Sequence, residues 1–184
     1  MQAQNPNNHI FKFCPRCGGD RLGDLSANAF ECPQCRFSFF LNTAAAVAAL
    51  ITRPDNRLLV VERNQEPAKG TWDLPGGFCN PQETAEEGLR REIHEELGLD
   101  ITSARYFCSA PNQYAYKDTI YETIDLAYIC TVNNPDDLHA NHEIAAVNFV
   151  PYSKISTERF GLHSIQIIVT NFLLHQKAET MTSR

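Results

Sequence analysis

The chain has 184 residues, of which 43% are hydrophobic and 21% charged, a balance typical of a folded globular protein rather than a collagen-like, coiled-coil or disordered one. Its net charge of −6 argues against broad nucleic-acid binding, which needs a basic face. The longest apolar run, residues 43–52, is too short to cross a bilayer, and the polar first residues lack a secretory pattern. We therefore expect a cytoplasmic protein with no membrane partner.

In chain order, the sequence divides into a small module, a main domain and two short ends. Residues 1–10 are polar and are expected to be flexible. Residues 11–41 carry paired cysteines among glycines and aromatics, which indicates a compact module of its own. Residues 42–176 carry the hydrophobic patterns of one ordinary domain, and residues 177–184 form a tail that we also expect to be flexible.

The first module contains two C-x-x-C pairs separated by fourteen residues. The four cysteines are Cys14, Cys17, Cys32 and Cys35. Two matched pairs favour a tetrahedral zinc site over a redox pair, which normally uses one such motif, or over two disulfides. A site closed by four thiolates leaves no coordination position open, so we expect Zn²⁺ to be structural here.

The same module has few positive charges for a nucleic-acid-binding surface. Its cations are Lys12, Arg16, Arg21 and Arg36. We therefore expect the module to provide structural support or a homodimer contact, in preference to binding nucleic acid. The other cysteines, Cys79, Cys108 and Cys130, lie in or beside predicted strands and are interpreted as packed thiols.

The main domain is predicted to combine several strands with two helices. The predicted strands are residues 44–52, 57–63, 101–109, 119–132 and 145–151. A glycine-punctuated segment, residues 74–78, leads into an acidic helix, and residues 161–176 form a second helix with apolar positions at helical spacing. This order predicts an α+β fold, in which a mixed sheet packs between helices.

The acidic helix carries capping signals at both ends. Thr84 and Glu87 match a capping box, which places the N-cap at Thr84, and Gly98 is a suitable residue to end the helix after Leu97. An apolar stripe along the helix should face the sheet. The stripe consists of Ala85, Leu89, Ile93 and Leu97.

Six glutamates lie within the fourteen residues from Glu83 to Glu96, with only two arginines among them. Glu92, Glu95 and Glu96 are spaced i, i+3 and i+4, so their carboxylates should converge. Converging carboxylates are costly unless a cation joins them, and Mg²⁺ or Mn²⁺ prefers oxygen ligands. The alternative is an acidic helix face that is merely solvated. The bare backbone at Gly76, just before the helix, favours the metal.

These residues form a pattern that resembles a complete Nudix box, GX5EX7REUXEEXGU with U aliphatic. The fixed positions are Gly77, Glu83, Arg91, Glu92, Glu95, Glu96 and Gly98. The lead-in, residues 70–78, also resembles the family, and Gln82 stands where the family often has glycine. The resemblance implies a Nudix fold over residues 42–175. A zinc ribbon before such a domain is similar to a subfamily that includes NADH and FAD pyrophosphatases.

The resemblance also implies roles for the box residues. Glu95 and Glu96 should bind Mg²⁺ (or Mn²⁺) together with the Gly76 carbonyl oxygen, and Glu92 should be a further ligand or the general base. The other fixed positions should be structural, with two of them joined as an ion pair that fixes the loop on the helix. They are Gly77, Glu83, Arg91 and Gly98, and the expected pair is Glu83 with Arg91.

Further candidate site residues lie outside the box. Glu143, in the loop before the last strand, should bind metal or act as the general base, unless it is an ordinary loop acid. Arg63 is a candidate for contacting phosphates. Residues 109–116 fall where the family places specificity motifs and match the NADH pyrophosphatase motif only in part. Their Pro111, Tyr114 and Tyr116 are candidates for substrate binding, unless the tyrosines only pack on the sheet.

The sequence thus predicts a metal-dependent nucleotide pyrophosphatase that cleaves the diphosphate of a small molecule such as ADP-ribose, NADH, FAD or a similar dinucleotide. The alternative is a regulator that senses nucleotides with the Nudix domain and contacts nucleic acid with the zinc ribbon. The complete box favours the enzyme, because sensors commonly lose box glutamates, and the ribbon lacks a basic surface.

Overall fold

The computed structural model describes residues 10–26 and 28–182. The chain forms two compact units. The first comprises the residues up to Thr43 together with Gln113–Glu122, and the second comprises Ala44–Asn112 and the residues from Thr123 onward. The predicted domain boundary near residue 42 stays a prediction.

The first unit contains a small antiparallel sheet. Its strands, in the order β1-β2-β3, are Gly23–Ser26, Ala29–Glu31 and Ser38–Phe40. The ring of Phe11 packs against those of Phe30 and Phe39, with centroids 5.1 and 5.9 Å apart. A unit with three short strands has little apolar surface to bury, and domains this small usually need a metal, a disulfide or a partner for stability.

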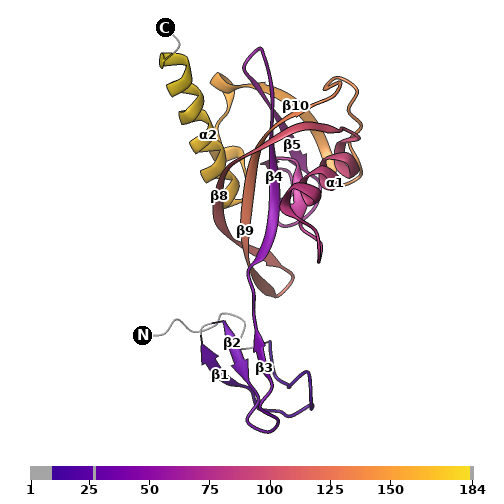
Figure 1. The fold of residues 1–184 in the computed structure, drawn as a ribbon, viewed down its shortest axis with the longest axis vertical. Coiled ribbons are helices and arrows are strands. Elements are labelled where there is room, and N and C mark those ends of the chain that lie inside the picture. Colours follow the sequence, from indigo (N-terminus) through magenta and orange to yellow (C-terminus); the bar gives the residue numbers. More distant parts are fainter. Residues whose placement is uncertain (1–9, 27, 183–184) are drawn as a thin grey trace. The chain divides into compact units, whose positions relative to one another are not determined.

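The second unit is built on one mixed sheet with the strand order β10-β5-β4-β9-β8 (Figure 1). The bounds are Ala44–Arg53 for β4, Arg57–Arg63 for β5, Ile101–Tyr116 for β8, Thr119–Val132 for β9 and Ile144–Pro151 for β10. Two short strands, β6 (Trp72–Asp73) and β7 (Gly76–Phe78), pair with β5 and β4. Strand β4 runs parallel to β9 and antiparallel to β5 and β7.

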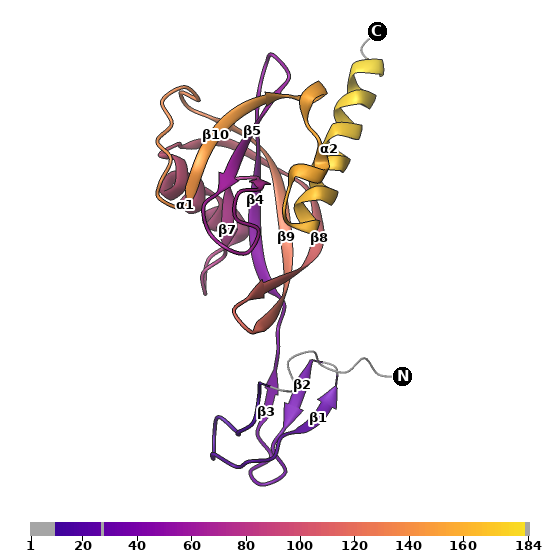
Figure 2. The ribbon, with the colours of Figure 1, turned by 180° about the vertical axis from the view of Figure 1, so that it is seen from behind.

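Each face of this sheet is covered by one helix (Figures 1 and 2). Helix α1 (Ala85–Leu97) packs on one face and α2 (His163–Thr182) on the other. Alternate residues of β4 point to opposite faces, so Val47, Ala49 and Ile51 pack in the core with α1. Ala48 and Leu50 join the core with α2. The predicted α/β/α arrangement is therefore confirmed.

Two elements extend beyond their predicted ends. Strand β8 continues through residues 110–116, because the polar segment there pairs in the β8–β9 hairpin. Helix α2 continues to Thr182, so the prediction of a flexible tail is wrong for residues 177–182. Good helix formers and side-chain contacts stabilise that end: Glu179 lies 3.3 Å from His175 and accepts a hydrogen bond of 3.2 Å from Gln176.

The predicted flexibility of residues 1–9, 183 and 184 lies outside the described residues. Within the described residues, neither α1 nor α2 is long and apolar enough to cross a membrane.

Candidate active site

Helix α1 begins and ends as its caps predict. The Thr84 hydroxyl accepts a 3.2 Å hydrogen bond from the Glu87 backbone N–H, and the Glu87 carboxylate accepts one of 2.8 Å from the Thr84 N–H. At the other end, Gly98 adopts a left-handed conformation with φ 67°. Its N–H donates to the His94 carbonyl over 2.9 Å. Because both ends are fixed, the positions from which the glutamate side chains leave the helix are also fixed.

The loop before α1 brings its backbone against the helix carboxylates. The Gly76 N–H donates a 3.0 Å hydrogen bond to the Glu96 carboxylate. A Cβ on Gly76 would lie 2.0 Å from the Val47 carbonyl oxygen, and one on Gly77 would lie 2.5 Å from the Glu92 carboxyl carbon. At Gly76 the obstacle is backbone, so only glycine allows this approach, whereas at Gly77 a Cβ would displace the Glu92 carboxylate.

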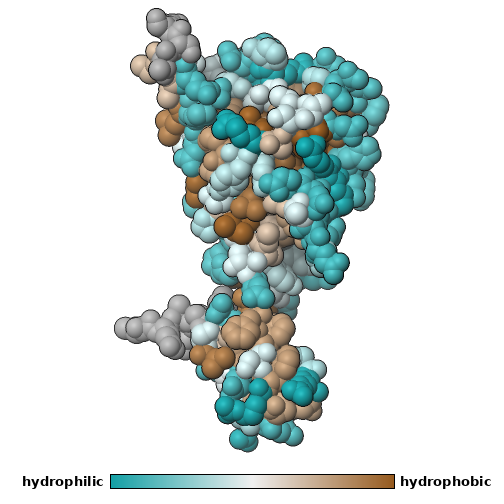
Figure 3. All heavy atoms as spheres, in the orientation of Figure 1, coloured by the Kyte–Doolittle hydropathy of each residue, from teal (hydrophilic) through white to brown (hydrophobic). Residues whose placement is uncertain are grey.

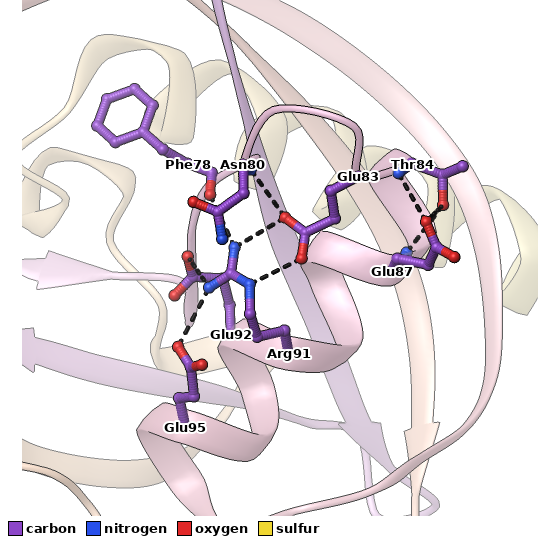
Figure 4. Close-up of polar contacts among 8 residues, drawn as sticks. All are labelled: Phe78, Asn80, Glu83, Thr84, Glu87, Arg91, Glu92 and Glu95. Atoms are coloured by element: carbon purple, nitrogen blue, oxygen red, sulfur yellow. Dashed lines mark hydrogen bonds and ion pairs between the residues drawn. The ribbon is translucent and has the colours of Figure 1, made fainter.

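Arg91 is the centre of the polar network at the start of this site (Figure 4). Its guanidinium donates two hydrogen bonds to Glu83, at 2.8 and 3.0 Å, so the predicted ion pair is present. It also donates to Glu92 at 2.8 Å, to Glu95 at 3.1 Å and to the Phe78 carbonyl at 3.0 Å. These further bonds, which the spacing of the box does not indicate, tie two proposed metal ligands to one cation.

The glutamates of the box differ in their electrostatic state. Hydrogen bonds from Arg91 and from the Asn80 N–H lower the pKa of Glu83 to about 2. Burial raises the pKa of Glu96 to about 8, with the charges of Glu92 and Glu143 acting in the same direction, against the hydrogen bond from Gly76. Burial also raises the pKa of Glu92, although Arg91 opposes this. Glu83 is therefore a fixed structural anion, whereas Glu96 is a buried carboxyl group short of positive charge.

This shortage of positive charge fits a divalent cation. Glu92 and Glu96 are half-buried beside bare backbone, and hard cations such as Mg²⁺ bind oxygen ligands of this kind. Glu95 is more open, with its side chain 57% exposed. Hydrophilic side chains cover the side of the second unit on which α1 lies (Figure 3).

Glu86 has a partner inside the domain and is not merely a solvated acid of the helix. Glu86 is exposed, but its carboxylate accepts a 3.1 Å hydrogen bond from the buried Tyr128 hydroxyl. It therefore satisfies a polar group of strand β9 and takes no part in the carboxylate group of Glu92 and Glu96.

The loop between β9 and β10 brings Glu143 to the same end of α1. The N–H of Asn141, two residues earlier, donates a 2.9 Å hydrogen bond to the Glu96 carbonyl oxygen. The charge of Glu143 acts on both Glu92 and Glu96, raising the pKa of each. The charge of Glu143 therefore reaches two acids of helix α1, although the three residues lie up to 51 positions apart in the sequence (143 − 92).

A family model described as NUDIX domain matches residues 42–169. The chain belongs to the Nudix family. Residues 77–99 are therefore its Nudix box, with fixed positions at Gly77, Glu83, Arg91, Glu92, Glu95, Glu96 and Gly98.

The chain is similar to several curated proteins that are named as hydrolases or pyrophosphatases. It is 28% identical over 125 residues to the NAD-capped RNA hydrolase NudC of Vibrio parahaemolyticus, an alignment covering 68% of this chain and 46% of that one. It is 44% identical over 64 residues to the ADP-ribose pyrophosphatase of Methanocaldococcus jannaschii, covering 35% of this chain and 37% of that one. The chain thus spans less than half the length of these curated relatives.

The fold is also that of solved Nudix structures. The crystal structure of a Nudix hydrolase from Nitrosomonas europaea superimposes with a TM-score of 0.72 and 22% sequence identity. The superposition covers 91% of this chain and 93% of that one. At this identity the likeness shows the fold alone.

The four cysteines of the first unit lie at zinc-site spacing. The Sγ atoms of Cys14 and Cys35 are 3.7 Å apart, and those of Cys17 and Cys32 are 3.6 Å apart. Zn–S bonds of ~2.3 Å would place the sulfurs of a tetrahedron ~3.8 Å apart. Within residues 10–26 and 28–182, this is the one group of three or more Cys, His, Asp or Glu ligand atoms that lie within 4.8 Å of one another. The arrangement fits Zn²⁺.

Arg63, a predicted phosphate contact, is held inside the Nudix domain by a residue that the sequence analysis missed. Its guanidinium donates to the Asp73 carboxylate at 2.5 Å and to the Pro67 carbonyl at 2.8 Å. Asp73 is only 6% exposed, and burial raises its pKa while Arg63 opposes the shift. Asp73 directly precedes residues 74–77 (the LPGG segment), and this position was the signal in the sequence that it belongs to the site. A phosphate contact by Arg63 stays a prediction.

The predicted specificity residues lie along strand β8. Pro111 is exposed, Tyr114 is half-buried and Tyr116 is exposed. The Lys117 ammonium lies over the Tyr116 ring, 5.3 Å from its centroid. Tyr114 and Tyr116 belong to the first unit, whereas Pro111 belongs to the second, which also holds the box. Their roles in substrate binding stay predictions.

Proposed function

We propose that the protein is a Mg²⁺-dependent pyrophosphohydrolase that cleaves the diphosphate of a nucleoside diphosphate derivative. The observation that carries this proposal is the group of Glu92, Glu96 and Glu143 beside the Gly76 backbone, in which a buried carboxyl group lacks a compensating charge. A diphosphate is repelled by such a group of acids, so it can bind beside them only when cations lie between the two. The box is complete, which favours an enzyme over the alternative of a nucleotide-sensing regulator.

The chain's residues have separable tasks in this proposal. Glu92, Glu95, Glu96 and the Gly76 carbonyl would hold Mg²⁺ or Mn²⁺. The bound ion would screen the diphosphate and increase the acidity of water. Arg91 orients Glu92 and Glu95, and Glu83 anchors Arg91.

Glu143 is the proposed general base. Its carboxylate is 51% exposed and can therefore exchange protons with water, whereas Glu92 is bonded to Arg91 and Glu96 to Gly76. Water attacks one phosphorus atom while Glu143 takes its proton. The bond from that phosphorus to the bridging oxygen breaks, and the second phosphate leaves with this oxygen.

The relatives narrow the substrate class. One is named for ADP-ribose and the other for NAD-capped RNA, and both substrates contain an adenosine diphosphate joined to a second group. We infer that a dinucleotide-like diphosphate is the substrate here. The zinc ribbon is proposed to be structural or to form a homodimer contact, and the protein is proposed to work in the cytoplasm.

The test is a substrate panel of ADP-ribose, NADH, FAD, diadenosine polyphosphates and NAD-capped RNA, with AMP or shortened RNA separated by chromatography. Mg²⁺ should support turnover, and EDTA should abolish it. Glu96→Gln should lower kcat/KM by about a thousandfold or more, because a group acting in the transition state is lost. Glu86→Gln, on the exposed part of the same helix, is the matched control. Full activity in EDTA, or in Glu96→Gln, would overturn the proposal.

A further inference from the structure

The loop between β9 and β10 is hydrogen-bonded to the C-terminal end of helix α1. Asn141 donates from its backbone N–H to the Glu96 carbonyl at 2.9 Å and from its side-chain amide to the Glu95 carbonyl at 3.4 Å. His139 donates to the Leu97 carbonyl at 2.8 Å. A helix leaves its last carbonyls without partners, and this loop supplies donors for three of them.

Asn141 also holds the proposed base. Its side-chain oxygen accepts a 2.9 Å hydrogen bond from the Glu143 N–H. From the other side, the Asn64 N–H, just after strand β5, donates to the Glu143 carbonyl at 2.9 Å. The Asn64 side chain donates to the His142 carbonyl, also at 2.9 Å. Both backbone groups of Glu143 are therefore held, one from the helix side and one from the sheet.

Packing does not hold the Glu143 side chain itself. The side chains of His142 and Glu143 are 84% and 51% exposed, and the buried core begins at the next residue, Ile144. In an exposed loop, hydrogen bonds to the backbone set the position of the Cα atom from which the side chain extends. A displacement of a reacting group by about 1 Å can cost about a hundredfold in rate.

We propose that Asn141 is a positioning residue, which places the Glu143 carboxylate opposite Glu92 and Glu96 by joining the loop to the end of helix α1. The inference rests on the proposed function and deepens it. Asn141 touches neither substrate nor metal and acts through Glu143.

The rival interpretation is that Asn141 serves only as a helix cap. The two interpretations separate in the variant Asn141→Ala, because its backbone N–H can still donate to Glu96. What the substitution removes is the acceptor for Glu143 and the long 3.4 Å contact to Glu95. If Asn141 only caps the helix, the variant should slightly weaken the exchange protection of all of α1. If Asn141 positions Glu143, the variant should lower kcat strongly and weaken protection only around Glu143.

The kinetic test uses the full chain with its best substrate. Asn141→Ala should lower kcat by at least about tenfold and leave KM within about twofold. Glu143→Gln should lower kcat further, and the double variant should be no slower than Glu143→Gln alone. Asn141→Ser, which can still accept the Glu143 N–H, should recover at least a third of the wild-type kcat. Asn148→Ala, at an exposed position of β10, is the control.

A second measurement does not need activity. Hydrogen exchange should become faster in peptides covering Glu143 and Ile144 of Asn141→Ala, while helix α1 keeps its protection. Wild-type kcat in Asn141→Ala, additive losses in the double variant, or loosening of the whole helix would each overturn the inference. If the wild-type protein cleaves no substrate, the proposed function fails, and the exchange pattern still decides whether Asn141 holds Glu143.

Discussion

At the scale of single residues, the two glycines of the LPGG segment face atoms of different kinds. The missing Cβ of Gly76 points at the Val47 carbonyl, a backbone atom that cannot move freely. The missing Cβ of Gly77 points at the carboxylate of Glu92, the end of a flexible side chain. The same added methyl group should therefore damage stability at one position and activity at the other.

We expect Gly76→Ala to lower the free energy of unfolding by roughly 3 kcal/mol, because of the backbone clash and a φ of 148°. Gly77→Ala should stay within about 1 kcal/mol of wild type but lose most turnover, because Glu92 must move away. Urea denaturation and AMP release measure the two effects. Equal stability losses in both variants would contradict this view of the loop.

Glu96 offers a stability test that does not depend on catalysis. Its pKa in the folded protein is raised to about 8, so folding favours the protonated form, and the cost of the charge grows as the pH rises from the ordinary value toward 8. In EDTA at about pH 8, Glu96→Gln should be more stable than wild type by at least about 1 kcal/mol. Near pH 4 the difference should vanish. If Glu96→Gln were less stable than wild type in EDTA at about pH 8, other groups of the protein would have to compensate the charge of Glu96, and the prediction would be wrong.

The identity of the box residues could be predicted from the sequence more fully than the hydrogen bonds and ion pairs that they make. The Glu83–Arg91 pair is present as predicted, because the box sets its two members at a fixed spacing, whereas metal binding and catalysis by the other glutamates stay predictions. The sequence could not show that Arg91 also bonds Glu92 and Glu95, or that Arg63 pairs with Asp73. Those contacts depend on how side chains turn once the loop and the helix have packed.

At the scale of elements, the start of helix α1 can be tested through its cap. Thr84→Ala removes the hydroxyl that accepts the Glu87 N–H and should cost about 1 kcal/mol of unfolding free energy. Thr170→Ala is a suitable comparison, because the Thr170 hydroxyl bonds back to the Gln166 carbonyl within α2 and contributes little. Chemical denaturation measures both. A loss in Thr84→Ala no larger than that in Thr170→Ala would count against the capping box.

The junction of loop and helix should be sensitive to acid. The pKa of Glu83 is lowered to about 2, so its bond to Arg91 stabilises the fold above the ordinary carboxyl range and is lost as the pH falls toward 2. Glu83→Gln should therefore be less stable than wild type at neutral pH, with the difference shrinking in acid. Thermal unfolding between about pH 7 and pH 2 measures this. A constant difference over that range would exclude the ion pair as its cause.

Element boundaries followed from local patterns where those patterns were strong. Strands β5 and β9 have their predicted bounds, as does α1, because alternation and caps are local signals. The far half of β8 and the last turns of α2 were missed. Both are polar or mixed segments whose structure depends on a partner strand or on contacts along the helix surface.

At the scale of the whole molecule, the zinc ribbon is expected to depend on its metal and the Nudix domain is not. Wild-type protein should carry one zinc per chain by elemental analysis, and Cys14→Ser should lose it, because three thiolates hold zinc less well. Hydrogen exchange in Cys14→Ser should rise over β1–β3 and stay slow in α1. Cys108→Ser, outside the cysteine cluster, should keep its zinc. Unfolding of both units together would contradict this.

The pairing of strands across the whole sheet is the level that local patterns least determine. The β4–β5 hairpin could be predicted, because a short turn joins two alternating segments. The parallel pairing of β4 with β9 could not, because it joins segments far apart in the chain and leaves no local signal.

That long-range pairing has a consequence for how the protein folds. Ala44 pairs with Thr123 and Ile51 with Cys130, so every contact in this ladder spans 79 residues (123 − 44 and 130 − 51). Ladders of this kind raise the contact order, and the entropy of closing a long loop must be overcome before any bond is gained. Strand β4 also pairs with the LPGG segment that meets the box glutamates. During refolding, recovery of the carboxylate site should therefore wait for the slow closure of β9 onto β4.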